Sequence, residues 1–305
     1  MSVLRRQETE EPTMRIEDAL DRFLLQLEAD GRSAHSIRQY RRHVHQFAAW
    51  AAQGATVAEV ECVRHENLAR FLAAPEALVR PDGRPKQPTS VNSLRSSLRG
   101  FFQYLHRAGL VKTDPSRMIR RALCGEPPPR TLSEEDQEAL LATLAQATGA
   151  AAERDHALFL LLLRTGIRIS SALAVEVGDV DLGRGEIMLR RCKAGQVQRI
   201  FLPPDVKENL AKSLDGRDSG WLFQGRGGRP ITARHAQRRL SYWLAKSGGK
   251  PISPHGLRHS FAMGFYRRSR DLPLVQKALG HRSIASTMRY ARALDDDLRA
   301  AMASA

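Results

Sequence analysis

Residues 161–173 of this 305-residue chain read LLLRTGIRISSAL. The apolar run over residues 157–163 predicts a buried helix. Gly166 predicts the end of that helix, because glycine readily interrupts helical backbone. A second helix is expected to begin directly afterwards, so that Arg168 lies on the tight turn between the two.

A β-hairpin is predicted further along the chain. GEIMLRR at residues 185–191 and VQRIFL at residues 197–202 have the composition of two paired strands. The turn between them reads CKAGQ and carries Lys193 near its start. This lysine is therefore expected at the tip of the hairpin.

Residues 253–262 read SPHGLRHSFA and predict the start of another helix. Ser253 suits the N-cap, and Pro254 suits the first helical position, where its missing amide is not needed. His255 and Arg258 are three positions apart. They are therefore expected on one face of that helix.

Residues 278–292 read ALGHRSIASTMRYAR. Gly280 predicts the end of a helix, and His281 is expected on the turn that follows. Tyr290 comes nine positions after His281, on or beside a short helix. This segment therefore brings a histidine and a tyrosine close to a helix end.

The charge of the chain favours a polyanionic partner. Its 48 Lys and Arg against 33 Asp and Glu give a formal charge of +15 and a pI near 10.5. Such an excess repels itself in a compact fold unless a polyanion neutralises it, so nucleic acid is the first partner to consider. A membrane surface comes second, although no separate polybasic tail suggests a lipid tether. A merely basic protein without such a partner stays open.

Composition divides the chain into four parts. These are a polar arm at 1–13, a helical unit at 14–115, a proline-bearing linker at 116–130 and a second unit at 131–305, with a tail from about residue 291. Amphipathic patterns in the first unit predict helices over 16–29, from Ser33 or Ser36 to Trp50, over 65–74 and over 91–108, with an exposed loop over 75–90. The linker contains CGEPPPR, which cannot continue a helix, and SEED at 133–136 fits a capping box. We therefore expect a mainly α fold with a small β-sheet.

Cysteine usage and hydropathy exclude several classes of protein. Cys62, Cys124 and Cys192 form neither a CxxC pair nor a zinc spacing, so no disulfide framework and no structural metal are expected. The N-terminus lacks the apolar run of a secretory signal, and no stretch approaches the ~20 apolar residues of a membrane span. A cytoplasmic protein without membrane association is expected.

The polar residues of these segments suit attack on a phosphodiester. Arg168 and Arg258 can offer forked donors to the non-bridging oxygens, where negative charge grows in the transition state. Tyr290 supplies a nucleophilic oxygen, and His255 is the candidate general base for its proton. His281 could donate to a non-bridging oxygen. The sequence has no P-loop, HExxH motif or carboxylate cluster for magnesium, so neither a metal nor another cofactor is expected.

The pieces TGIR, HGLRH and LGH…Y, in this order and spacing, resemble the catalytic signature of the tyrosine recombinase (phage integrase) family, most of all its Xer-like bacterial members. The resemblance implies a helical core-binding domain followed by a mixed α/β catalytic domain. It also implies a site-specific recombinase that cleaves and rejoins DNA through a 3′-phosphotyrosine intermediate. Lys193 would then protonate the 5′-hydroxyl leaving group.

The same resemblance implies an assembly on double-stranded DNA. Four protomers would act on two recombination sites, and the C-terminal tail would dock on a neighbouring subunit. A sister recombinase is a possible partner, and the protein would work at the nucleoid. The DNA sequence, the direction of the reaction and the host element are not given by the sequence.

The sequence departs from the family pattern at several positions. Shortly after Arg168 the family usually has an acidic residue that would orient the arginine, whereas this chain has Ser171 nearby. Either another acid such as Asp179 replaces it, or the site is looser. Met263 stands where threonine is common. These departures bear on the rate of the reaction rather than on its nature.

Basic residues on predicted outward helix faces are candidates for DNA contact, although a solvated charged face explains them equally well. They are Arg41, Arg42, Arg95, Arg99, Arg234, Arg238 and Arg239.

Other readings of the site stay open. Each residue alone has a structural explanation: Arg168 as a surface charge, the histidines as buried hydrogen-bonded side chains and Tyr290 as a packed ring. His259 is assigned no chemistry. At the level of function the alternatives are a type IB topoisomerase-like enzyme, a non-catalytic DNA-binding protein on the same fold and, with the least support, an RNA-binding module.

Overall fold

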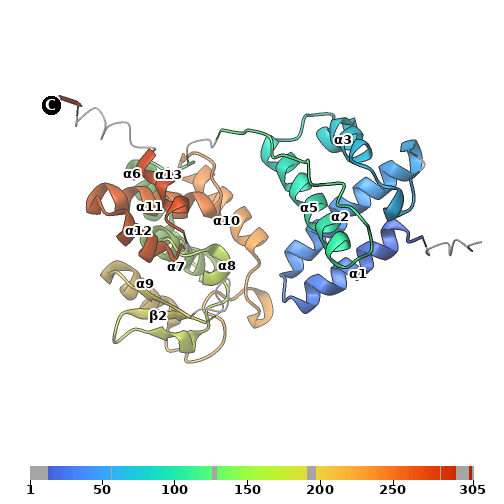
Figure 1. The fold of residues 1–305 in the computed structure, drawn as a ribbon. Coiled ribbons are helices and arrows are strands. Elements are labelled where there is room, and N and C mark those ends of the chain that lie inside the picture. The colour runs from blue at the N-terminus through green and yellow to red at the C-terminus, as the bar shows by residue number, and fades with distance from the viewer. Residues whose placement is uncertain are drawn as a thin grey trace, which may run out of the picture. The chain divides into compact units, whose positions relative to one another are not determined.

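A computed structural model describes residues 13–55, 57–125, 129–190, 197–281, 283–292 and 302–303. The chain forms two compact units that divide between Glu126 and Pro127. This division falls inside the stretch predicted as a linker. Each unit is described by itself (Figure 1).

The N-terminal unit is entirely helical in its regular elements. These are α1 (Ile16–Ala29), α2 (Ala34–Trp50), α3 (His65–Ala73), α4 (Pro75–Leu78) and α5 (Pro88–Arg107), with short π and 3-10 turns at Ala51–Ala55 and Val60–Cys62. Ser33 caps α2, because its side chain accepts a hydrogen bond from the amide of Ser36. The predicted loop over residues 75–90 is partly wrong, since Pro75 and Pro88 each start a helix. Proline is tolerated there because the first helical amides have no partner within the helix.

Aromatic rings fill the core of this unit. Phe23 of α1, Phe47 of α2 and the pair Phe101 and Phe102 of α5 are all buried. The Phe101 and Phe102 ring centroids are 5.0 Å apart, and those of Phe47 and Phe102 are 5.8 Å apart, both in edge-to-face geometry. Burial of such rings is the main stabilising contribution to a unit of this size.

The C-terminal unit combines helices with one small sheet. Its helices are α6 (Glu134–Ala145), α7 (Ala150–Thr165), α8 (Ile169–Ala172), α9 (Pro204–Leu214), α10 (Ala233–Lys246), α11 (Pro254–Ser269), α12 (Leu272–Leu279) and α13 (Ala285–Arg292), with 3-10 turns at Val177–Asp179 and Arg226–Gly228. The strands β1 (Val180–Asp181), β2 (Glu186–Leu189) and β3 (Gln198–Phe201) form an antiparallel sheet in the order β1-β2-β3. The predicted fold class is confirmed, and the predicted hairpin is β2 and β3. β1 was not predicted, because a strand of two residues is too short to show the alternation of apolar and polar residues that indicates a strand.

Helix α7 is the centre of the C-terminal unit. Residues 157–163 are buried without interruption, because α6, α9 and α11 all pack on this helix. A helix covered on all sides needs no polar face. Its end is therefore held rigidly, and Arg168 follows that end directly.

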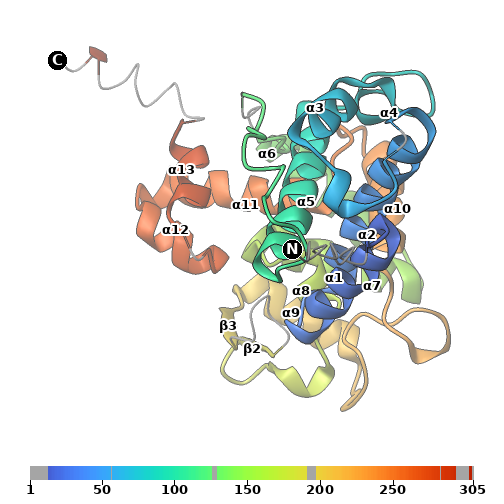
Figure 2. The same cartoon turned by 45° about the vertical axis from the view of Figure 1, so that its right-hand side comes forward.

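Helices α11, α12 and α13 lie together in both views (Figures 1 and 2). Between them they bury a small cluster that includes Met263, Val275, Leu279 and Tyr290. Most residues of the predicted catalytic signature come from these three helices and the turns between them. None of the helices that the structure describes is long and apolar enough to cross a membrane.

Candidate active site

Arg258 ties two helix ends together inside the C-terminal unit. Its guanidinium donates to the carbonyl of Gly166 at the end of α7 (2.6 Å) and to the carbonyl of Leu279 at the end of α12 (2.7 Å). The side chain is only 2% exposed. One buried cation therefore satisfies two helix-terminal carbonyls that would otherwise lack partners.

The two turns held in this way carry Arg168 and His281. Gly166 and Gly280 both adopt left-handed backbone, with φ of 63° and 60°. A Cβ on Gly166 would lie 2.2 Å from the Phe261 ring, so the turn requires glycine for space as well as for conformation. Arg168 occupies the N-cap position of α8, on the tight turn that the sequence predicts.

Arg168 and Arg258 form the cationic part of the site. Within the described ranges, Arg168 is half-buried and makes no hydrogen bond or ion pair, and the Nε of Arg258 is buried without a partner. Burial, followed by the charge of Arg168, lowers the pKa of Arg258 to about 10. Arg258 thus remains charged at neutral pH, and both guanidinium groups keep donors for an anion.

Of the two alternatives for the missing acid near Arg168, replacement by Asp179 does not agree with the partners of its carboxylate. The Asp179 carboxylate accepts from the Arg190 side chain (2.5 Å) and from the Glu176 amide (3.1 Å). It is thus committed to the 3-10 turn and to the edge of the sheet. Ser171 is buried on α8 and supplies no charge.

His281 is held by the helix that follows it. Its Nδ1 lies 3.0 Å from the hydroxyl of Thr287, a fully buried residue of α13. Burial, followed by the charges of Arg258 and Arg168, lowers the pKa of His281 to about 4. The neutral ring is therefore fixed by Nδ1 and keeps Nε2 for a further partner.

Tyr290 lies on α13 with 1% of its surface exposed. Its hydroxyl is 2.9 Å from Nδ1 of His259, and burial raises the pKa of the phenol. The hydrogen-bond partner is thus His259, to which the sequence analysis assigns no chemistry, rather than His255. The sequence feature that could have drawn attention to His259 is its position directly after Arg258, since both residues are buried on α11.

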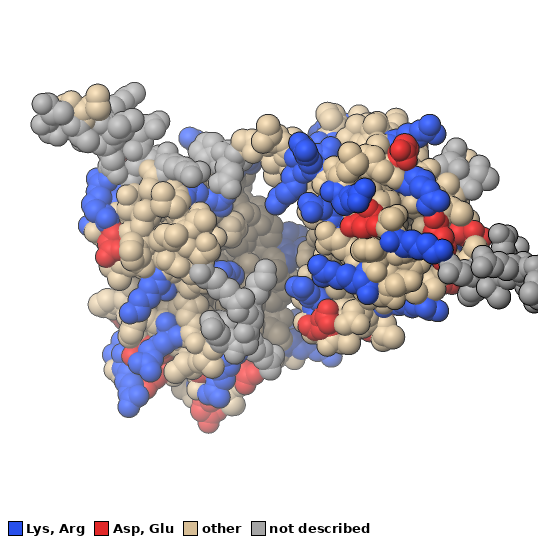
Figure 3. Space-filling model, viewed as in Figure 1, with Lys and Arg blue, Asp and Glu red and all other residues tan. Residues whose placement is uncertain are grey.

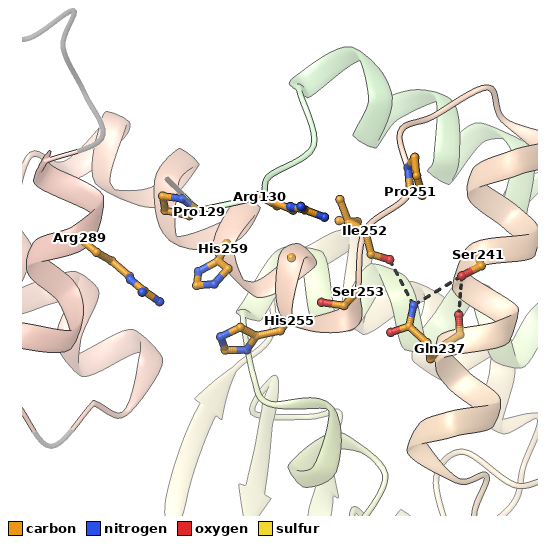
Figure 4. Close-up of a pocket in the computed structure, with 11 residues that line it drawn as sticks. Pro129, Arg130, Gln237, Ser241, Pro251, Ile252, Ser253, His255, His259 and Arg289 are labelled. Carbon is orange, nitrogen blue, oxygen red and sulfur yellow. Dashed lines mark hydrogen bonds between the residues drawn. The ribbon is translucent and has the colours of Figure 1, made fainter. Parts of the chain in front are cut away.

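His255 and His259 line one cavity of about 540 Å³ (Figure 4). Their ring centroids are 4.4 Å apart, and Arg289 extends from α13 toward them. Partial burial, then the charges of Arg258, Arg289 and Arg168, lower the pKa of His255. Arg289 is a second residue that the sequence analysis missed.

Lys193 lies in the segment 191–196, outside the described residues, and so does the tail from residue 293 to 301. The strands that flank Lys193 are described. The side chain of Gln198 on β3 reaches the turn of His281, since a Cβ on Gly280 would lie 2.6 Å from it. The base of the hairpin therefore packs beside the site.

The arginines predicted for DNA contact differ in their surroundings. Arg41, Arg42, Arg234 and Arg238 are exposed, whereas Arg95 and Arg99 are half-buried and their Nε atoms have no partner among the described residues. Figure 3 shows Lys and Arg spread over the visible face of the N-terminal unit.

Arg239 does not share the predicted outward face. It pairs with the buried carboxylate of Asp155 (2.5 Å), which also accepts from Arg154 and from the indole of Trp243. The arginine thus neutralises a carboxylate of α7 and ties α10 to that helix.

The described part of the chain contains no cluster of three or more His, Cys, Asp or Glu side chains that could hold a metal ion. The site that it contains is instead a group of arginines and histidines around a tyrosine.

Comparison with known families supports this picture. The family described as "Phage integrase family" matches residues 130–296, which is more than half of the 305-residue chain. The chain belongs to the phage integrase family. The family described as "Phage integrase, N-terminal SAM-like domain" matches residues 20–109.

Curated relatives of this integrase-family chain are Xer tyrosine recombinases. The chain is 30% identical to "Tyrosine recombinase XerC" of Neisseria meningitidis serogroup B over 282 residues, 91% of each chain. It is 33% identical to "Tyrosine recombinase XerD" of Pseudomonas putida over 214 residues, 67% of this chain and 71% of the relative. The resemblance inferred from TGIR, HGLRH and LGH…Y is confirmed, and the protein is a site-specific tyrosine recombinase. The topoisomerase-like and non-catalytic alternatives are not favoured.

Solved structures agree on the fold. The XerH site-specific recombinase bound to palindromic difH substrate aligns with a TM-score of 0.72 at 20% identity, over 96% of this chain and 97% of that one. A lambda integrase dimer bound to a COC′ core site aligns with a TM-score of 0.69 at 18% identity, over 91% of this chain and 77% of that one.

Proposed function

We propose that this integrase-family chain cuts and rejoins double-stranded DNA at specific sites with Tyr290 as the nucleophile, Arg168, Arg258 and His281 as phosphate ligands and Lys193 as the acid for the leaving group. The observation that carries the proposal is the double tie made by Arg258. It fixes the turns of Arg168 and His281 against the helix that bears the arginine. Residues far apart in sequence then converge on one phosphate.

The charges of the site suit a pentavalent phosphorus. Arg168 and Arg258 offer planar donors to the non-bridging oxygens, and the neutral His281 offers Nε2. Burial and then the charge of Arg168 lower the pKa of Arg258, so the two guanidinium groups repel each other in the absence of an anion. A bound phosphodiester relieves this repulsion. Binding and transition-state stabilisation therefore draw on the same groups.

The reaction conserves the phosphodiester energy in a bond to the protein. Tyr290 attacks phosphorus, the 3′-phosphate becomes linked to the phenol, and the 5′-oxygen leaves with a proton from Lys193. The reverse attack by a 5′-hydroxyl rejoins the strand. No nucleotide hydrolysis is required, because the number of phosphate ester bonds is unchanged.

We infer the assembly from the family and from its DNA complexes. The relatives XerH and lambda integrase were solved on difH substrate and on a COC′ core site. For this chain the proposal is four protomers on two duplex sites, with the tail after Tyr290 docking on a neighbour and with a sister recombinase as a possible partner. Arg41, Arg42, Arg234 and Arg238 would contact the DNA backbone at the nucleoid in the cytoplasm.

A suicide substrate tests this proposal. Binding sites are first selected from a library of random duplexes, and a nick is then placed next to the cleavage position so that the adduct is trapped. The wild-type protein should form a covalent protein–DNA adduct on a denaturing gel, in EDTA as well as in magnesium, and Y290F should form none. Equal adduct from Y290F would refute the assignment of the nucleophile.

A further inference from the structure

We propose that Thr287 is a positioning residue for His281: its hydroxyl donates to Nδ1 of the histidine ring, so that the ring proton stays on Nε2 and faces the DNA phosphate. The inference rests on the proposed function, in which His281 binds a non-bridging oxygen. It adds to the site a residue that the sequence analysis does not single out.

The hydroxyl of Thr287 is committed to the His281 ring. Its oxygen lies 3.0 Å from Nδ1, and Thr287 is fully buried. Other helical threonines of this unit use their hydroxyls differently, since Thr143 and Thr165 donate to the carbonyl four positions earlier, at 2.7 Å and 2.6 Å. Among the described residues, the side chain of Thr287 has no hydrogen bond other than the one to His281. Its hydroxyl proton is therefore available for Nδ1.

The main chain of His281 is held independently of its ring. Its amide donates to the carbonyl of Gln276 (3.1 Å), and its carbonyl accepts from the side-chain amide of Gln276 (2.9 Å). Two positions earlier, the carbonyl of Leu279 accepts from Arg258 (2.7 Å). These contacts leave open the rotation of the ring and the nitrogen that carries its proton. Within the described ranges, Thr287 is the one residue that hydrogen-bonds the ring.

A neutral imidazole carries one ring proton, and the place of that proton decides what the ring can bind. Burial, followed by the charges of four neighbouring basic side chains, lowers the pKa of His281 to about 4, so the ring is neutral at neutral pH. From the largest effect to the smallest, these neighbours are Arg258, Arg168, His255 and Arg289. An anionic phosphate oxygen only accepts hydrogen bonds, so it needs the proton on Nε2. Nδ1 is then a lone pair that requires a donor, and the Thr287 hydroxyl supplies one.

The opposite tautomer is disfavoured at both ends of the ring. With the proton on Nδ1, the lone pair on Nε2 would face the phosphate oxygen, and two groups that only accept would repel each other. The hydroxyl proton of Thr287 would also lack an acceptor in the part of the chain that the structure describes, and a buried donor without a partner is destabilising. The contact between the two side chains therefore serves the reaction when Thr287 is the donor.

Helix α13 carries Thr287 and the nucleophile on one buried face. Thr287 and Tyr290 are three positions apart and are 0% and 1% exposed. The amide of Thr287 donates to the carbonyl of Ile284 (2.8 Å), which fixes the start of the helix. The packing of α13 that buries the tyrosine thus also positions the ring of His281.

A double-mutant cycle tests whether Thr287 acts through His281. T287V removes the hydroxyl and keeps the shape of the side chain. We expect T287V to form the covalent adduct with the suicide duplex about 10-fold more slowly than wild type, because one orienting hydrogen bond is lost. H281A should be slower still, and T287V added to H281A should cause no further loss. A purely structural role predicts that T287V slows both backgrounds equally.

Two further variants of α13 control for packing. T287S keeps the hydroxyl and loses only the methyl group, so it should cleave at close to the wild-type rate even if its Tm falls. S286A changes the exposed residue next to Thr287 and should equal wild type. If T287S were as slow as T287V, packing would explain the effect and the inference would fail.

The state of the His281 ring can be measured without any cleavage. In protein labelled with ¹⁵N-histidine, two-bond correlations from the ring protons show which nitrogen carries the proton, and H281A identifies the signals of His281. We expect a protonated Nε2 and an unprotonated Nδ1 in the wild-type protein at neutral pH. In T287V the Nδ1 signal should move to higher frequency, because this nitrogen no longer accepts a hydrogen bond, and T287S should restore it.

Three results would overturn the inference: a wild-type cleavage rate for T287V, an equal loss from T287V in the H281A background, or a His281 ring protonated on Nδ1 in the wild-type protein. Failure of the proposed function looks different. The wild-type protein would then form no adduct, while the ring signals of His281 would still respond to T287V.

Discussion

The interior of the N-terminal unit and the interior around α11 are built on opposite principles. In the first, Phe47, Phe101 and Phe102 pack edge-to-face and bury apolar surface. In the second, Arg258, His259 and Tyr290 are also buried, but His259 shares a hydrogen bond with Tyr290, and Arg258 donates to two helix-terminal carbonyls. The first arrangement stabilises the fold. The second keeps donors and bases in place for a ligand.

This difference indicates that the interior around α11 is the one arranged for a function rather than for stability. Burial of a cation or of a neutral histidine disfavours the folded state unless a partner compensates for it. The site tolerates this cost because Arg258 finds two helix-terminal carbonyls. Under the proposed function, a bound phosphate supplies the remaining compensation. The following experiments test the contrast between the two interiors.

The largest effect is expected in the aromatic core. F102A should lower the free energy of unfolding of the N-terminal unit by about 3–5 kcal/mol, because it leaves a cavity among packed rings. Hydrogen exchange in α5 peptides at increasing urea concentration measures this loss. Hydrogen exchange in α11 peptides should stay unchanged. An equal loss of protection in α11 would contradict the view that the two units have independent cores.

A smaller effect is expected for D155N in the C-terminal unit. Asp155 is fully buried and accepts from Arg154, Arg239 and Trp243. The amide keeps an acceptor but loses the charge that neutralises two arginines, so the unit should lose about 2–3 kcal/mol. Urea unfolding followed by Trp243 fluorescence reports the change. If D155N were as stable as the wild-type protein, solvent rather than Asp155 would compensate for the charges of the two arginines.

Acidification should weaken both units, and the C-terminal one more. His43 in the first unit, and His259 and His281 in the second, have pKa values lowered to about 4 from 6.5. The unfolded chain therefore binds more protons than the folded one between these values, and stability falls as pH drops below about 6.5. From pH 7 to pH 5 we expect a loss of about 1–2 kcal/mol for each well-buried histidine.

Variants assign this loss to the histidines. H43Q should flatten the pH dependence of the N-terminal unit, where Nδ1 of His43 bonds Ser97 (2.7 Å). If the stability of the N-terminal unit depended on pH in H43Q as it does in the wild-type protein, His43 would not be the cause of that dependence.

The smallest effect is expected from inorganic phosphate. At about ten times its Kd, phosphate should stabilise the C-terminal unit by about 1.4 kcal/mol, since it relieves repulsion between Arg168 and Arg258. The Tm and the exchange of α11 peptides report this effect. R168Q should reduce it, and an equal gain in R168Q would place the anion elsewhere.

Much of the helical framework was readable from the sequence. The predicted helix over residues 16–29 matches α1, and Ser33 was one of the two predicted caps of α2. The turn of Arg168 after Gly166 was also correct. These features depend on periodicity and on backbone preferences that act within a few residues. The short helix α4 and the strand β1 were missed, because elements of four and two residues are decided by their neighbours.

The sequence by itself determined most of the longer helices, the kind of chemistry and the family, since amphipathic spacing and the ordered set of arginines, histidines and tyrosine are properties of the chain. Only the tertiary structure decided the partners. Arg258 meets Gly166 across 92 positions, Tyr290 meets His259 across 31, and Arg239 meets Asp155 across 84. Contacts of this range depend on how helices pack, and no local pattern encodes which of two histidines on one helix will face the tyrosine.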